Sequence, residues 1–360
     1  MSLWDVVTGW VSSDAKRYLY APVSGDQVRG ATYEPSALKP RRDYFRLWLV
    51  EMCLRQDRAW FVSWHPAVHS IVRFQFGSRQ TDIPGIAGEL SLPDVGQQNL
   101  DRVVQLNHPM TTLLPYNGGT VELTAGLLAM EGTNLIAGFI KTMGDFAGLL
   151  MLPQLSAAVS VATPIASGVE QLLKNANGGL HLGLHQAFAS EGGGGANVFK
   201  PGYYAVIRTD ENQVKPSDLW VKDDRLHIGK SEAGLKPLSG VAYMLFRVEK
   251  RAERDDWEGL TSIRDPYNKA LEALEQQNAQ RAETFCRVAV AEALRSPDLT
   301  QADRIRVART VKEEYDQARE LGLGAIRAGL PTLTTAMARA ISPAQALTLG
   351  APDFGDLFSS

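Results

Sequence analysis

The chain has 360 residues, with 44% hydrophobic and 21% charged side chains, a formal net charge of −3 and a pI near 6.1. This composition is ordinary for a globular protein, and the length suffices for a sizeable core. The slightly acidic balance argues against a general nucleic-acid binder, which would carry a basic surplus. Two cysteines are too few for a disulfide framework, so we expect Cys53 and Cys286 to be reduced, buried thiols.

Residues 1–40 predict an arm rather than a domain. They hold scattered glycines and prolines together with aromatic residues, among them Trp4 and Trp10. Because such side chains need to be buried on the rest of the chain or on another subunit, both tryptophans are candidate interaction residues. The start contains Asp5 and lacks the basic and apolar regions of a secretory signal, which favours a cytoplasmic location.

Residues 41–262 predict a β-rich body. Short segments with alternating apolar and polar residues are separated by turn residues, a pattern typical of β-sandwich-like folds. Asn117-Gly118-Gly119 ahead of a strand predicts a hairpin, and Asp223-Asp224 predicts a second, tight hairpin.

An apolar helical insertion is expected within this body at residues 134–174. Its first part has helical spacing of large apolar residues, namely Leu135, Phe139, Met143, Phe146 and Leu150. Residues 146–169 carry no charge and are numerous enough to cross a bilayer, but Pro153 and Pro164 would break a continuous helix. We therefore expect short helices packed against protein, with a membrane-inserting hairpin as the alternative.

Residues 265–322 predict an antiparallel helical hairpin. Asp265 and Pro266 are typical of a helix start, and Thr300 with Asp303 three residues later is close to a capping box. The apolar row expected on the second helix is Ile305, Ala308, Val311, Tyr315 and Ala318.

Residues 323–360 predict a flexible tail whose end resembles a docking peptide. Two acidic residues, Asp353 and Asp356, alternate there with Phe354, Leu357 and Phe358, the remaining candidate interaction residues. A tether with an acidic, aromatic tip suits capture by a groove on a partner. The alternative is that the tip folds back on its own body.

The histidines offer weak candidates for a metal site. His181 and His185 share a face in a helix or in a strand, because four residues return to the same side of either. A site would need a further donor, such as Glu191 or one of His65 and His69. The glycine-rich segments lack the spacing of nucleotide-binding loops, so we predict no cofactor.

These observations predict an α+β protein with a β-sandwich-like body, an inserted apolar helical segment and a C-terminal antiparallel helical hairpin. The expected function is that of a non-catalytic structural or adaptor subunit of an intracellular assembly, bound to protein partners or to itself. One alternative is a membrane-active, pore-forming effector that uses residues 134–172. Another is an enzyme of unmarked type around His181 and His185.

Overall fold

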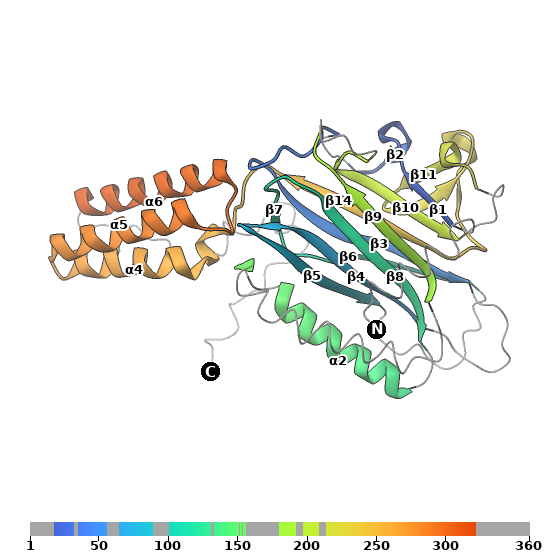
Figure 1. Cartoon of the computed structure of the whole chain (residues 1–360), viewed down its shortest axis with the longest axis horizontal. Helices are drawn as coiled ribbons and strands as arrows, with labels where there is room; N and C mark the ends of the chain where they lie inside the picture. Colours follow the sequence, from blue (N-terminus) through green and yellow to red (C-terminus); the bar gives the residue numbers. More distant parts are fainter. Residues whose placement is uncertain are drawn as a thin grey trace, which may run out of the picture.

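A computed structural model of the chain describes residues 18–31, 35–55, 65–88, 101–130, 133–150, 152, 154–155, 180–191, 197–208 and 214–321. In these ranges three β-sheets form a body, and a group of helices projects from one end of it (Figure 1). The strands are β1 (Tyr18–Pro22), β2 (Val28–Arg29), β3 (Tyr44–Arg55), β4 (His65–Phe76), β5 (Arg79–Gly88), β6 (Asp101–Pro109), β7 (Leu114–Pro115), β8 (Val121–Met130), β9 (Leu180–Phe188), β10 (Gly202–Arg208), β11 (Leu219–Lys222), β12 (Arg225–Ile228), β13 (Lys236–Pro237) and β14 (Tyr243–Arg251). The helices are α2 (Thr133–Leu150), α4 (Thr261–Glu275), α5 (Ala279–Arg295) and α6 (Gln301–Leu321).

Two antiparallel sheets share one hydrophobic core. The first sheet runs β1-β10-β14-β3-β6, with β7 paired to β3, and the second runs β5-β4-β8-β9. One cluster joins Leu47 and Phe246 of the first sheet to Val72 and Leu184 of the second. The prediction of a mixed α+β fold is thereby confirmed, whereas the finer expectation of a β-sandwich remains a prediction.

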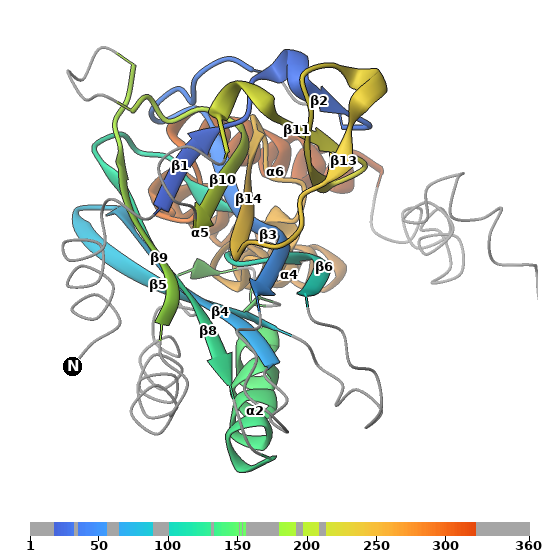
Figure 2. The same cartoon turned by 90° about the vertical axis from the view of Figure 1, so that its right-hand side faces the viewer.

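A third, smaller sheet covers the other face of the first sheet. It runs β13-β12-β11-β2, and its Val221 and Leu226 share a second cluster with Val50 and Leu245. In Figure 2 the third sheet lies above the first, and α2 lies at the opposite end of the view. Strands β1 and β2 of the predicted N-terminal arm belong to these sheets, while Trp4 and Trp10 lie outside the described residues.

One of the two predicted hairpins is confirmed. Asp223 and Asp224 connect β11 to β12 with φ angles of 52° and 57°, the left-handed geometry that a two-residue hairpin turn requires. The hairpin predicted at Asn117-Gly118-Gly119 is wrong. Strand β7 before it pairs with β3, whereas β8 after it pairs with β4 and β9, so this turn carries the chain from the first sheet to the second.

Helix α2 packs on the edges of the first two sheets. Its residues Phe139, Met143 and Phe146 are buried, as their spacing predicted. The Phe139 ring lies directly on Gly88 of β5, where an added Cβ would come within 2.4 Å of the ring. Among the described residues no helix is long and apolar enough to cross a membrane, and residues 156–174 of the predicted insertion lie outside that part.

The C-terminal helices number three in the described ranges, not two. The first predicted helix begins earlier, at Thr261, so that Pro266 lies inside it, and it ends at Glu275. Gln277 takes a left-handed φ of 56°, and Asn278 then starts α5 by accepting a hydrogen bond from the Arg281 N–H. We call α4, α5 and α6 together the helical unit.

The apolar row of α6 differs from the predicted row at its first position. Ile305 is 54% exposed, whereas Val307 is fully buried. Val307 and Val311 pack with Ala289 and Ile263, at the point where all three helices meet. A third helix therefore decides which side of α6 is covered.

Candidate functional site

The helical unit is fixed to the body at the first turn of α6. The Thr300 hydroxyl accepts a hydrogen bond of 3.2 Å from the backbone N–H of Asp303, as a helix N-cap does. In a capping box the side chain of Asp303 would return to the N–H of Thr300. Here the Tyr44 hydroxyl of β3 accepts from that N–H at 2.9 Å and donates to the Asp303 carboxylate at 2.8 Å. The body therefore supplies one part of the helix cap.

Arg254 completes this buried joint. Its side chain is 1% exposed and donates two hydrogen bonds, of 2.6 and 3.1 Å, to the carboxylate of Asp256. Its backbone N–H reaches the Asp303 carboxylate at 3.1 Å. The Asp298 carboxylate accepts from the N–H of Leu155 at 2.5 Å, which ties Leu155, within the charge-free residues 146–169, to the loop before α6. Since such groups are costly to bury without partners, this network favours a single attachment geometry.

The far end of the helical unit, which we call its tip, is packed with small side chains. Ala270 and Ala273 of α4 and Ala282 of α5 form a cluster with Cys286 and Tyr315. Small residues allow helices to approach closely. The longer side chains of α4 and α5 therefore project on either side of the line along which these two helices meet.

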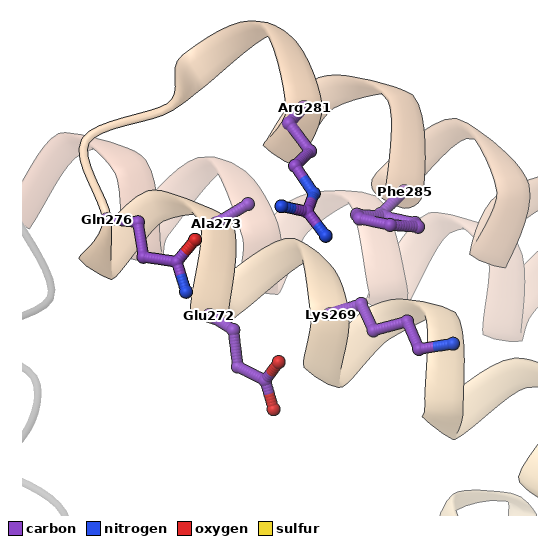
Figure 3. Close-up of a pocket in the computed structure, with 6 residues that line it drawn as sticks. All are labelled: Lys269, Glu272, Ala273, Gln276, Arg281 and Phe285. Atoms are coloured by element: carbon purple, nitrogen blue, oxygen red, sulfur yellow. The ribbon is translucent and has the colours of Figure 1, made fainter.

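A groove between α4 and α5 lies over this tip (Figure 3). It has a volume of about 190 Å³, and its lining residues are Lys269, Glu272, Ala273, Gln276, Arg281 and Phe285. Ala273 is buried and Phe285 is half-buried, whereas the four polar residues are exposed. The groove thus has a small apolar floor and a mainly polar lining.

The groove carries two cations, Lys269 on the α4 rim and Arg281 on the α5 rim. In the described part of the chain neither Lys269 nor Arg281 forms an ion pair, and the Arg281 guanidinium lies 5.5 Å from the centroid of the Phe285 ring. Figure 3 shows the carboxylate of Glu272 directed away from Arg281. The stacked guanidinium keeps its outward N–H groups available for a carboxylate, in the manner of a charge-assisted hydrogen bond.

The predicted histidine candidates are not brought together with a third donor. Nδ1 of His185 lies 3.1 Å from the Thr124 hydroxyl, and the carbonyl of His181 accepts from Arg208. Strand pairing is irregular at this point: Leu180 and Leu182 pair with consecutive residues of β8. Across the ranges that the structure describes, no three His, Cys, Asp or Glu side chains are grouped to hold a metal.

The other candidate residues named from the sequence are either buried within the fold or lie outside the described residues. Cys53 and Cys286 are both buried and form no disulfide in the described part of the chain, and burial raises the pKa of the Cys286 thiol. His69 is buried on β4, where burial lowers its pKa to about 4 and its Nδ1 lies 2.8 Å from the Gly85 carbonyl. The docking-like residues, Phe354, Leu357 and Phe358, lie outside the described residues.

Sequence reasoning missed the groove because it predicted two helices in residues 265–322, where the structure has three. The signal that could have found it is Asn278, a strong N-cap residue, followed by Arg281 and then by Phe285 four positions later. No protein-family model, curated protein or solved structure matches this chain.

Proposed function

We propose that the protein is a non-catalytic adaptor subunit whose helical unit captures a protein partner in the groove between α4 and α5. The β-body serves as the support, and the groove takes an aromatic or aliphatic side chain that has a carboxylate beside it. The observation that carries the proposal is the floor of Ala273 and half-buried Phe285, flanked by Lys269 and Arg281, which form no ion pair among the described residues.

The attachment of the helical unit supports this role. A docking element binds more tightly when its geometry is fixed beforehand, because less freedom is lost on binding. Tyr44, Asp303 and Arg254 fix the base of the helical unit through buried hydrogen bonds. The tip, where the groove lies, projects away from the sheets (Figure 1).

The chemistry of the groove favours a peptide of one kind. Arginine and aromatic residues are enriched among the side chains that dominate the energy of protein interfaces. Arg281 and Phe285 supply both in a single stacked pair, on the helix α5 that forms one wall. In a partner segment with an acidic residue next to an apolar one, the carboxylate would bind Arg281 and the apolar side chain would contact Phe285.

Photo-crosslinking in the native cell tests the proposal. A photoreactive residue placed at Gln276, on the rim of the groove, is expected to give a discrete crosslinked product. The same residue at Arg309, which is exposed on α6, serves as the control and is expected to give none. The product should disappear when Phe285→Ala and Arg281→Glu are added. Equal products from both positions, or products that ignore the groove variants, would exclude the proposed site.

A further inference from the structure

We infer that the groove between α4 and α5 is occupied by residues 353–358 of the same chain, so that a partner must displace this segment. The inference rests on the proposed function, and it names the first occupant of that same groove. Four features of the chain carry it: the course of α6, the length of chain beyond it, the side chains of the segment, and the place of the rival basic surface.

Helix α6 delivers the chain to the tip of the helical unit. Val307 packs at the base, with Ile263 of α4 and Ala293 of α5. Tyr315 packs two turns further on, with Ala273 and Ala282 beside the groove. The helix continues to Leu321, about 9 Å beyond Tyr315 at 1.5 Å per residue. The following residues therefore begin their path close to the groove.

The chain beyond α6 is long enough to reach the groove without strain. Residues 322–352 separate the end of α6 from Asp353. For the flexible tail that the sequence predicts, a segment of this length has a root-mean-square span of roughly 30 Å, comparable with the dimensions of the helical unit itself. Tethering at this range gives an effective concentration on the order of millimolar, so even a weak contact is populated.

The side chains of the segment complement those of the groove. Asp353 and Asp356 provide carboxylates for Arg281 and Lys269, which have no ion-pair partner among the described residues. Phe354 or Leu357 provides the apolar side chain for the floor at Phe285. Phe354 lies between the two acidic residues in sequence, as the apolar floor lies between Lys269 and Arg281 in space, and Glu272 also lines the groove.

A second basic surface is the main alternative binding site for residues 353–358. Arg29, Lys222 and Arg225 are registered neighbours across β2, β11 and β12, so their side chains share the outer face of the third sheet. Arg29 is already paired with Glu232 at 2.9 Å. Figure 1 places this sheet on the side of the body away from the helical unit, whereas α6 ends at the tip. The groove is therefore the nearer site for the segment.

Disulfide trapping in the full-length chain tests the contact. Under mild oxidation, Glu272→Cys with Leu357→Cys is expected to form a bond within one molecule, detected by mass spectrometry of the monomer band. Arg309→Cys with Leu357→Cys is the matched control and is expected to form at least tenfold less. A bond that links two molecules, or equal trapping in both pairs, would overturn the inference.

Competition by a peptide of residues 350–360 gives an independent measurement. The labelled peptide should bind a full-length variant with Phe354→Ala, Leu357→Ala and Phe358→Ala at least tenfold more tightly than it binds the wild type, whose own segment competes. Adding Arg281→Glu should remove binding, while adding Lys222→Glu and Arg225→Glu should leave it unchanged. Thermal unfolding of each variant checks that it is folded.

The outcomes separate this inference from the proposed function. Peptide binding that is lost with Lys222→Glu and Arg225→Glu, or no binding to any variant, overturns the inference. A partner still crosslinked through Gln276 in that case leaves the proposed function standing. If no partner is crosslinked through Gln276 but Glu272→Cys still traps Leu357→Cys, the segment occupies the groove and the proposed function is excluded.

Discussion

The hydroxyl of Tyr44 donates a 2.8 Å hydrogen bond to the carboxylate of Asp303, and this contact joins the central β-body to the first turn of the last helix. The same hydroxyl accepts from the N–H of Thr300, so one side chain serves as both donor and acceptor. Removing it leaves a buried backbone donor without its acceptor, which is more costly than the net worth of one hydrogen bond.

Tyr44→Phe is therefore expected to lower the free energy of unfolding by about 1–3 kcal/mol. Amide hydrogen exchange should speed up most at Thr300 and in the first turn of α6. Tyr20→Phe is the matched control, because the Tyr20 hydroxyl makes no hydrogen bond in the described part of the chain, and we expect it to cost less than about 0.5 kcal/mol. Equal effects in urea unfolding would show that the Tyr44 contact adds nothing to the joint.

His69 makes the protein less stable in acid. Its pKa is lowered to about 4 by burial, against an ordinary value of 6.5, so between these values the unfolded chain binds a proton that the folded chain does not. Stability is then full above pH 6.5 and falls as the pH drops toward 4, by about 3 kcal/mol.

His69→Asn tests this dependence, because its amide retains a donor for the Gly85 carbonyl but does not titrate. Unfolding measured from pH 4 to 7 should show a shallower slope in the variant than in the wild type. An unchanged slope would mean that another group causes the acid sensitivity.

Glu51 is expected to have the opposite effect to His69 on how stability changes with pH. Burial between the first and third sheets raises the pKa of its carboxyl, and the hydrogen bond from the Leu226 N–H only partly offsets this. The folded chain then holds a proton that the unfolded chain has released, so Glu51 reduces stability as the pH rises through its folded pKa. Glu51→Gln should gain stability relative to the wild type between pH 4 and 7. A difference that stays constant over that range would contradict the assignment.

Gly88 permits the close approach of α2 to β5. Gly88→Ala would place a Cβ 2.4 Å from the Phe139 ring and is expected to lower the free energy of unfolding by about 1–3 kcal/mol. Adding Phe139→Leu should recover part of this loss by removing the clash. Gly148→Ala, on the open side of α2, has no atom within 4 Å and should instead raise stability by about 0.5–1 kcal/mol. The denaturant midpoint of each variant, compared with that of the wild type, shows whether the substitution lowers or raises stability.

The sequence by itself determined the features that depend on neighbouring residues. Asp223-Asp224 forms its hairpin because both residues tolerate left-handed backbone angles, and Thr300 caps α6 because its hydroxyl reaches an N–H three residues ahead. The face of α2 that carries Phe139, Met143 and Phe146 follows from its helical period alone.

The tertiary structure alone decided the features that depend on distant pairing. The turn at Gly118 joins two sheets instead of two paired strands, and Val307 is covered in place of Ile305 because a third helix packs there. The groove exists because the chain reverses at Gln277 and brings Phe285 beside Ala273. Local spacing fixes which way a side chain points on its own element, but only the packing of elements far apart in sequence determines what it meets.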